Sequence, residues 1–526
     1  MQLSNILANK SISMSPTVLK VMERVNVRVI LTAVILLSLF IALFASIQFA
    51  TPGLAGNDGY YHIKMGYLIR EEGLKPAFDA LPHTILNQEA FYDHHLLYHV
   101  YLALFAAVDP AVDGGLQLTQ GAKLASILLP SLAFLAIWWL LRAQRVPWAA
   151  LWTVALFVMS EAFLYRMSMP RAQSGSLLIL VLALHWLLNG RYRLLLPLGF
   201  IYVWFYNAFP LLLVLAGVYV IATWMLTRRF AWQALFYPFA GLTLGLLINP
   251  YFPQNVTFIA GHLLPKVGES ATKVGNEWTP YRTWTIVENS GPALAAVFLG
   301  ALAMGWNKDR VNRSTLTAFG LALLFGFMLF KSRRFVEYYP PFALIFLAFS
   351  ASPLLTKWQA DWRGRKMVRQ RPYLSLLLPV VALLLLSYPL LVSIRDARQL
   401  MDNSKPAARY AAAALWLGAN SEPGSKIFQT DWDDFTRLYF YNSDAIYTAG
   451  LDPTFMELHD KPLFDEWVAI TRGKIKNPSE PIRTLFDAQF IFSDTKHSSF
   501  LERAGQDPDL VELYRDDDAV IFAVAK

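Results

Sequence analysis

A series of long apolar runs is the feature that most constrains what this chain can fold into. About 20 apolar residues in a helix cross roughly 30 Å of hydrocarbon. The 526-residue chain is 55% apolar and only 16% charged, whereas soluble domains carry about 25% charged residues. The sequence therefore predicts an integral membrane protein. We expect about eleven transmembrane helices, near 29–50, 122–141, 148–164, 174–188, 194–206, 208–226, 233–250, 289–306, 314–330, 340–356 and 373–394.

Three of the apolar runs have alternative interpretations. The run at 29–49 is longer than the roughly 7–15 residues of a signal-peptide core, so we expect a retained first span. The stretch 194–226 is too long for one helix, and YNAFP at 206–210 predicts a tight turn that divides it. The run at 96–108 is short and carries His99, so we expect an interfacial helix there.

Basic residues between the spans predict the orientation of the chain. Under the eleven-span count they all fall on the side of the N-terminus (1–28), which the positive-inside rule makes cytoplasmic. The net charge of +8 is scattered over these short loops, which favours membrane anchoring over nucleic-acid binding. We expect a bacterial inner-membrane protein. The basic residues are Arg142, Arg145, Arg191, Arg193, Arg228, Arg229 and those within 307–313 and 357–371.

Acidic residues gather on the opposite, extracytoplasmic side. The long loops at 51–121 and 251–288 lie there too, so we expect this face to carry the function. The middles of the spans are nearly free of charge, which disfavours a channel or proton-driven transporter. The outer acids are Asp58, Glu71, Glu72, Asp79, Glu89, Asp93, Glu161, Glu269, Glu277 and Glu337, against Glu23, Asp309 and Asp361 inside.

The tail at 395–526 differs from the rest in being charged and punctuated by Pro and Gly. Strands alternate with helices in its pattern, which predicts a small extracytoplasmic α/β domain. The fold class is thus a polytopic α-helical membrane domain at 29–394 followed by this α/β domain. We expect helices at 408–420 and 452–473, and strands at 425–431, 445–451, 488–494 and 519–526.

The stretch GNDGYYHIKM at 56–65 follows directly on the first span and places an acid at the membrane surface. Asp58 could form an Asx-turn or cap the helix that follows it. The neighbouring tyrosines could be ordinary belt aromatics. The other alternative is chemistry by Asp58 at the membrane surface, and spacing alone leaves both open.

NDGYYH resembles the first acidic motif of the catalytic subunit of oligosaccharyltransferases, which are GT-C glycosyltransferases. Three further segments resemble that family in the same order: GNEWTPYRTW, RRFVEYYPPFALIF and WLGANSEPGSKIFQTDWDDF. The resemblance implies a GT-C fold and transfer of a sugar or oligosaccharide from a polyprenyl-(pyro)phosphate-linked donor. It places Asp58 at the catalytic centre with Glu277 as the matching acid, and Tyr60, Tyr61 and His62 beside them as substrate-binding residues.

The resemblance also implies a divalent cation, Mg²⁺ or Mn²⁺. Asp58 and Glu277 offer the hard oxygen ligands that these ions prefer, and Glu161 is the candidate third ligand. The family's second acidic motif is replaced here by SEAFLYRMSMPRAQSGS, in which RAQ stands where acids are expected. We therefore expect weaker metal dependence than in the family.

TDWDDF is an imperfect version of the Trp-Trp-Asp signature with which that family recognises its acceptor peptide. The resemblance gives Trp432, Asp433 and Asp434 an acceptor-binding role. The alternative is that these residues simply begin a helix.

Two pairs of arginines on the outer side run against the positive-inside trend. Arg333 and Arg334 are either snorkelling side chains at a helix end or a forked clamp for a lipid-linked phosphate. Arg166 and Arg171, in a short outer loop, carry a similar argument. We expect these four arginines to bind the donor phosphate or the substrate.

FYDHHLLYH brings three histidines and an acid into one short segment. His95 and His99 are one helical turn apart and could share a face. A zinc site is one alternative, but the chain has no cysteine and no clear third ligand here. We expect Asp93, His94 and His95 to line the donor or acceptor groove.

Three functions stay open at this point. One is oligosaccharyltransferase-like transfer to a protein, and another is transfer of a single sugar to a lipid or polysaccharide. The last is a lipid-binding relative that has lost the chemistry. The expected partners are a polyprenyl-linked donor, membrane lipid and a protein, lipid or glycan acceptor.

Overall fold

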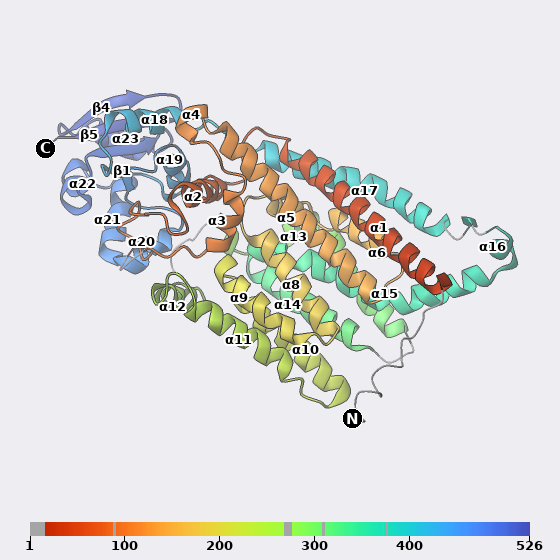
Figure 1. The fold of residues 1–526 in the computed structure, drawn as a ribbon. Coiled ribbons are helices and arrows are strands. Elements are labelled where there is room, and N and C mark those ends of the chain that lie inside the picture. Colours follow the sequence, from red (N-terminus) through yellow and green to blue (C-terminus); the bar gives the residue numbers. More distant parts are fainter. Residues whose placement is uncertain are drawn as a thin grey trace.

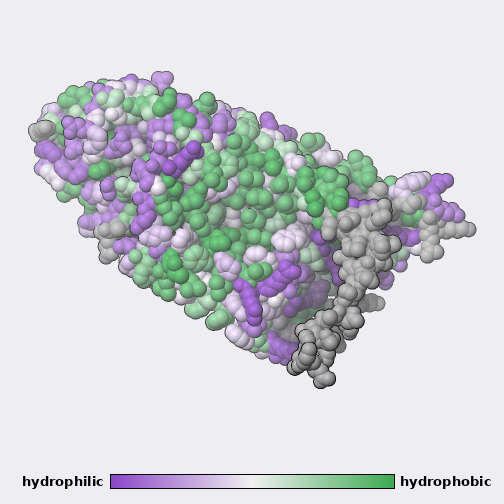
Figure 2. Space-filling model, in the orientation of Figure 1, coloured by the Kyte–Doolittle hydropathy of each residue, from purple (hydrophilic) through white to green (hydrophobic). Residues whose placement is uncertain are grey.

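The computed structural model describes residues 16–87, 91–267, 276–307, 311–371, 373–374 and 377–525. A helical bundle carries the C-terminal α/β domain at one end, and α16 (Lys366–Gln370) lies at the opposite end (Figure 1). On the face that Figure 2 shows, a hydrophobic band crosses the bundle between the more hydrophilic C-terminal domain and a hydrophilic region at the opposite end. Three acids named above, Glu89, Glu269 and Asp309, lie outside the described residues.

Within the described residues, seven helices are long and apolar enough to cross a membrane, or eight if one bent pair counts as a span. The prediction of a helical membrane protein with a C-terminal domain is confirmed, while the count of eleven spans stays a prediction. The seven are the Val27–Gln48 part of α1 (Pro16–Gln48), α5 (Leu116–Ala143), α10 (Pro210–Thr227), α13 (Thr283–Trp306), α14 (Arg313–Lys331), α15 (Tyr339–Gly364) and the Pro379–Asp402 part of α17 (Leu377–Asp402). Shorter apolar helices are α8 (Gln173–Leu188), η2 (Tyr192–Leu194) with α9 (Leu195–Phe205), and α11 (Gln233–Leu247).

The expected span at 148–164 is not one continuous helix. The chain forms α6 (Ala149–Val154) and η1 (Ala155–Val158), then bends by 95° into α7 (Glu161–Met167). Ser160 causes the break, because its backbone is extended and its hydroxyl accepts the Phe163 amide at 3.1 Å, which caps a new helix.

Two expectations for the loops agree with the structure. α9 ends at Phe205 and α10 begins at Pro210, so the apolar run at 194–226 is divided at YNAFP. α3 (Leu96–Ala103) has only eight residues, about 12 Å of helix, which is too short to span. The other short elements that connect the apolar helices are α2 (Asp58–Glu72), α4 (Pro110–Asp113), α12 (Gln254–Val267), η3 (Asn276–Trp278) and η4 (Arg333–Glu337).

Small residues and aromatic rings hold the bundle together. A Cβ at Gly241 of α11 would lie 2.1 Å from the carbonyl oxygen of Leu196 in α9, so these two helices touch backbone to backbone. In the core between α1 and α5, the rings of Phe44 and Phe134 meet edge to face with centroids 5.2 Å apart.

The C-terminal domain is built on a five-stranded mixed sheet in the order β2-β1-β3-β5-β4. β1 pairs in parallel with β2 and β3, whereas β5 is antiparallel to β3 and β4. Four strands lie where they are expected, and β4 was not expected from the sequence. The strands are β1 (Lys426–Gln429), β2 (Ile446–Tyr447), β3 (Phe490–Asp494), β4 (Leu510–Arg515) and β5 (Ala519–Val524).

The helices of this domain include α18 (Ala411–Asn420), as expected. The predicted helical stretch 452–473 is two helices, since Asp460 caps the second by accepting the Leu463 amide at 2.9 Å. The predicted domain boundary at 395 falls within α17. The remaining helices are η6 (Trp432–Asp434), α19 (Phe435–Tyr441), α20 (Pro453–His459), α21 (Lys461–Thr471), α22 (Ser479–Phe486) and α23 (Ser498–Ala504).

A buried arginine joins this domain to the outer loops. Arg437 of α19 is 1% exposed and its Nε donates to the Asn57 side chain at 3.1 Å. Its guanidinium lies over the ring of Tyr60, 4.3 Å from the centroid. These contacts dock α19 on α2, so the residues just before α19 face the start of α2.

Candidate active site

A cavity of about 810 Å³ lies between the end of the bundle and the C-terminal domain. Residues from both long outer loops, from the short loops and from the C-terminal domain line it. Ten of the residues predicted from the sequence line the cavity: Asp58, Tyr61, His62, His94, His95, Arg171, Glu277, Arg334, Trp432 and Asp433. The other predicted residues, Tyr60, Asp93, Glu161, Arg166, Arg333 and Asp434, lie outside its lining.

Asp58 lies in the first turn of α2 and points to an arginine. The preceding Asn57 occupies the cap position, where no side-chain cap bond is made. The Asp58 carboxylate instead forms an ion pair with Arg171 at 2.6 Å. Burial raises the pKa of Asp58, and the positive charge of Arg171 opposes this effect. Asp58 therefore contributes a carboxylate to the cavity instead of capping the helix.

Arg171 joins two carboxylates from different loops. Its Nη1 lies 2.6 Å from Glu277 Oε1, while its Nη2 binds Asp58. Arg166 binds the same Glu277 oxygen at 2.8 Å. Burial alone would raise the pKa of Glu277, but the two guanidiniums outweigh it and hold that pKa well below its usual value. Glu277 is therefore a permanent anion between two arginines.

Glu337 is a buried member of this network that was noted as an outer acid but not as a site residue. Arg166 Nε donates to Glu337 Oε1 at 2.9 Å, and Glu337 is only 1% exposed. Its position in RRFVEYY, one of the segments that resemble the family, was the available signal. Arg166 lies behind the cavity wall and braces Glu277.

The residues expected to hold a divalent metal do not fit that role as arranged. The guanidinium of Arg171 occupies the place between Asp58 and Glu277. Glu161 begins α7 and does not line the cavity. Across the part of the chain that the structure describes, no group of three or more His, Cys, Asp or Glu residues is arranged to hold a metal ion.

The two adjacent arginines of η4 point in different directions. Arg334 lines the cavity, donates to the Tyr206 hydroxyl at 2.5 Å and lies over the Trp278 ring, 5.0 Å from its centroid. Arg333 donates from Nε to the Pro280 carbonyl at 3.3 Å, outside the cavity. Arg334 is thus the arginine of this pair that faces the cavity.

The histidine segment forms one wall of the cavity. His95 stacks on Tyr206 with centroids 5.4 Å apart, and His94 lies 4.2 Å from His95, centroid to centroid. Asp93 is 2% exposed and lies behind this wall, where it binds His99. Tyr206 joins the site through packing that the sequence pattern does not reveal.

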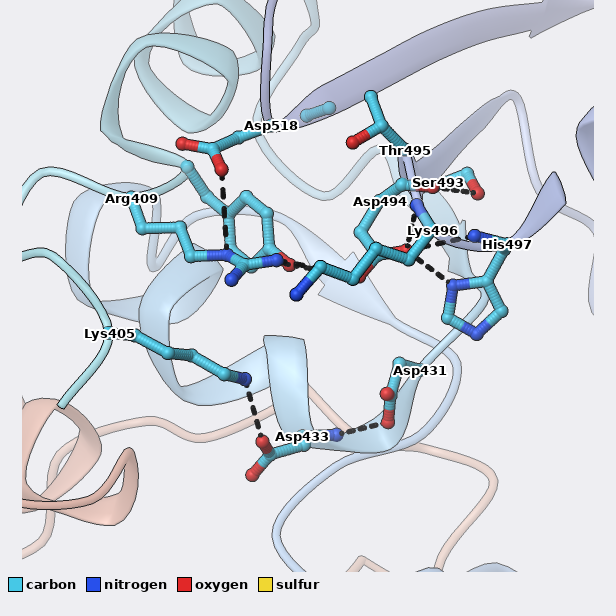
Figure 3. Close-up of polar contacts among 12 residues, drawn as sticks. Lys405, Arg409, Asp431, Asp433, Ser493, Asp494, Thr495, Lys496, His497 and Asp518 are labelled. Atoms are coloured by element: carbon cyan, nitrogen blue, oxygen red, sulfur yellow. Dashed lines mark hydrogen bonds and ion pairs between the residues drawn. The ribbon is translucent and has the colours of Figure 1, made fainter. Parts of the chain in front are cut away.

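The C-terminal domain contributes Asp431, Trp432 and Asp433 to the cavity lining. Figure 3 shows the polar contacts around Asp431 and Asp433. Asp433 accepts from Lys405 at 3.0 Å and from the Asn57 side chain at 2.5 Å. Asp431 accepts the backbone amide of Asp433 at 3.0 Å and so begins η6, which agrees with the helix-start alternative. Asp434 points away from the cavity, and burial, with the charges of Asp431 and Asp494, raises its pKa to about 8.

The fold and the site together define a membrane protein with the GT-C fold. Two kinds of solved structure support this statement. The oligosaccharyltransferase AglB of Archaeoglobus fulgidus in its apo form superposes with a TM-score of 0.62 at 13% identity, covering 94% of this chain and 74% of AglB. AglB in complex with an inhibitory peptide and dolichol-phosphate gives 0.60 at 12% identity, with the same coverage.

ArnT from Cupriavidus metallidurans, bound to undecaprenyl phosphate, is the second kind of structure. It superposes with a TM-score of 0.52 at 14% identity, covering 94% of this chain and 97% of ArnT. AglB and ArnT are both GT-C glycosyltransferases. At these identities the likeness shows the fold alone. No model of a protein family matches the chain, and no curated protein matches it either.

Proposed function

We propose that this chain is a membrane glycosyltransferase that transfers a sugar from a polyprenyl-phosphate-linked donor to an acceptor at the extracytoplasmic face. The proposal rests on the cavity between the bundle and the C-terminal domain. Arginines and carboxylates face one another in its lining. The solved relatives support the donor class, since AglB is seen with dolichol-phosphate and ArnT with undecaprenyl phosphate.

Arg334 is the proposed donor-phosphate residue. Its guanidinium is held by Tyr206 and Trp278, so it is oriented before any ligand binds. A fixed guanidinium offers a planar pair of donors that suits phosphate oxygens. Charge that develops on the departing phosphate is then stabilised without reorganisation of the site. Lys405, at the rim, adds a second positive charge beside Asp433.

Asp58 and Glu277 form the proposed catalytic centre together with Arg171. Asp58 orients the acceptor at the start of α2, and Arg171 supplies a positive charge in the position that a divalent ion would take between the two acids. This arrangement supports the expectation of weak metal dependence. Trp432 and Asp433 face the cavity from the C-terminal domain and are the proposed acceptor contacts.

A second candidate is transfer of a single sugar to a lipid or polysaccharide. A cavity of about 810 Å³ falls in the size range of pockets for small molecules. It suits a lipid phosphate with one or two sugars better than a long oligosaccharide. A lipid-binding relative without chemistry is an outcome of the test below.

Binding of undecaprenyl phosphate to the purified full-length protein in lipid nanodiscs tests the donor site. We expect Arg334→Ala to weaken binding at least about tenfold, because a charge-assisted contact contributes roughly 1.5–3 kcal/mol. Arg333→Ala is the matched control and should leave binding unchanged. Equal binding by all three proteins would refute the assignment of Arg334.

Turnover tests the enzyme itself. A panel of undecaprenyl-phosphate-linked hexoses is incubated with the protein and a lipid or glycan acceptor, and released undecaprenyl phosphate is measured. We expect release by the wild type. Binding of undecaprenyl phosphate without release from any donor would favour the lipid-binding relative.

A further inference from the structure

A buried chain of hydrogen bonds runs from an acid behind the cavity to a histidine that lines it. Asp93 Oδ2 binds His99 Nδ1 at 2.7 Å, and His99 Nε2 binds His62 Nδ1 at 2.8 Å. The three side chains are 2%, 0% and 5% exposed in the order Asp93, His99, His62. The backbone amide of His95 donates to the other Asp93 oxygen at 2.9 Å, so the carboxylate is fixed from both sides.

These hydrogen bonds fix the tautomers of the His99 and His62 rings. A carboxylate can only accept, so His99 must carry its proton on Nδ1 and present a lone pair at Nε2. That lone pair accepts the proton on His62 Nδ1, which leaves the lone pair of His62 at Nε2. His62 Nε2 makes no hydrogen bond to any residue that the structure describes, and His62 lines the cavity.

His62 lies one helical turn after Asp58 on α2, so both side chains share the face that borders the cavity. The carboxylates of Asp58 and Glu277 are already paired with Arg171, whereas His62 Nε2 has no partner among the described residues. His62 is therefore better placed to accept a proton than the carboxylates of Asp58 and Glu277.

The surroundings keep His62 neutral. Burial lowers its pKa well below the usual value, and His99, Arg171 and His94 lower it further. A neutral imidazole is the form that can take up a proton. The titratable and charged groups around the His62 ring are Asp58 and Tyr61 on α2, His94, His95, Tyr98 and His99 from α3 and the segment before it, and Arg171 from the loop before α8.

We propose that His62 is the general base of the transfer reaction, with His99 and Asp93 as positioning residues behind it, and that the acceptor carries a hydroxyl group. The inference rests on the proposed glycosyl transfer. It favours a hydroxyl acceptor, because a general base serves a group that loses its proton as it attacks.

The proposed step transfers one proton to His62 and one glycosyl group to the acceptor. The acceptor's O–H gives its proton to His62 Nε2 while its oxygen forms a bond to the anomeric carbon of the donor sugar. The bond between that carbon and the phosphate oxygen breaks, and its electron pair leaves with the phosphate. The imidazolium of His62 is stabilised through His99 by the negative charge of Asp93.

Chemical labelling of the wild type tests the hydrogen-bonded series Asp93–His99–His62, called the relay below, without any sugar donor. Diethyl pyrocarbonate acylates unprotonated imidazole nitrogens, and peptide mass spectrometry of the full-length protein in nanodiscs measures each histidine separately. We expect His62 to be labelled and His99, with both nitrogens bonded, to be protected. Labelling of His99 with protection of His62 would overturn the proposal.

Turnover of undecaprenyl-phosphate-linked hexoses tests the catalytic role. We expect His62→Gln to lower kcat at least about 100-fold, with undecaprenyl phosphate binding unchanged. Asp93→Asn removes the charge behind His99 and leaves one of the two acceptor oxygens, so kcat should fall with little change in KM, and the pH profile should move. His185→Gln, at a histidine of α8 outside the cavity lining, is the control.

These measurements separate the two proposals. If the wild type turns over no donor, the proposed function fails. The labelling pattern still shows whether His62 and His99 are hydrogen-bonded as described. If the wild type is active and His62→Gln retains its kcat, the relay is wrong and the glycosyltransferase assignment stands.

Discussion

The guanidinium of Arg171 lies 2.6 Å from the carboxylate of Asp58, the first residue of α2. The pair joins the first outer loop to the short loop before α8, and Glu277 completes it from the second long loop. In the sequence, Arg171 belongs to RAQ, which stands where acids are expected in the oligosaccharyltransferase family. An arginine at this position therefore gives Asp58 and Glu277 a shared ion-pair partner.

The first prediction concerns metal dependence. Wild-type turnover should continue in chelator, whereas Arg171→Ala leaves Asp58 and Glu277 without their shared cation. We expect turnover of Arg171→Ala to fall at least about 100-fold in chelator, the usual cost of losing one fixed charge-stabilising group. Mn²⁺ should restore part of it, since the ion can then take the place of the guanidinium between Asp58 and Glu277, although Glu277 stays paired with Arg166.

Arg333→Ala, next to the cavity but outside its lining, is the control and should behave as the wild type in chelator. Release of undecaprenyl phosphate with and without Mn²⁺ is the measurement. Complete loss of wild-type turnover in chelator, reversed by Mn²⁺, would contradict the prediction and make a metal essential.

The second prediction concerns Asp58 itself. Asp58→Asn keeps the size of the side chain but removes the charge that holds Arg171. We expect turnover to fall at least about 100-fold, while undecaprenyl phosphate, for which Arg334 is the proposed binding residue, should bind nearly as well as to the wild type. Asp79→Asn, at an exposed acid of the same loop, is the matched control. Turnover of Asp58→Asn equal to that of the control would remove Asp58 from the catalytic centre.

Much of the fold could be predicted because apolar runs and strand patterns are local. The turn at YNAFP and four of the five strands follow from such local signals. β4, with the sequence LVELYR, is mostly exposed and mixes charge with apolar residues, so no pattern marks it. The bend at Ser160 was missed because a single capping serine in an apolar run looks like part of a span.

The site was only partly predictable because its contacts join distant segments. Asp58, Glu277 and Arg334 could be named from motifs, but their partners depend on how the loops pack. Arg437 and Asn57, for example, are 380 positions apart and meet only because α19 docks on α2. Arg333 and Arg334 look alike in the sequence, and only the geometry of η4 separates them.

The third prediction uses the raised pKa of Asp434, which is about 8. Between its usual pKa near 3.8 and 8, the folded domain holds a proton that the unfolded chain has released. The folded state therefore loses stability relative to the unfolded state as pH rises through this window, and the loss is constant above about pH 8. Asp434→Asn removes the titration.

We expect the Tm of Asp434→Asn minus the Tm of the wild type to increase from pH 5 to pH 8. Above about pH 8 this difference should stay constant. Thermal unfolding at several pH values, followed by tryptophan fluorescence, checks this. Asp487→Asn, at a fully exposed acid, should show no such trend. A difference that does not change with pH would show that Asp434 is ionised in the folded protein.

The last prediction concerns how the C-terminal domain is held over the cavity. Arg437 is 1% exposed, donates to Asn57 at 3.1 Å and to the Pro406 carbonyl at 2.7 Å, and covers Tyr60. Arg437→Ala leaves these acceptors unpaired and opens space beside the ring. We expect a loss of about 1.5–3 kcal/mol of stability, the range for losing a hydrogen bond to a charged group.

Because Arg437 docks α19 on α2, the same change should loosen the wall that carries Trp432 and Asp433. Turnover should therefore fall although Arg437 does not line the cavity, and limited proteolysis should cut the segment between α17 and α18 sooner. Arg472→Ala, at an exposed arginine of the same domain, is the control. If Arg437→Ala lowers Tm but leaves both turnover and the cleavage pattern of this segment unchanged, then docking of α19 does not determine the shape of the cavity.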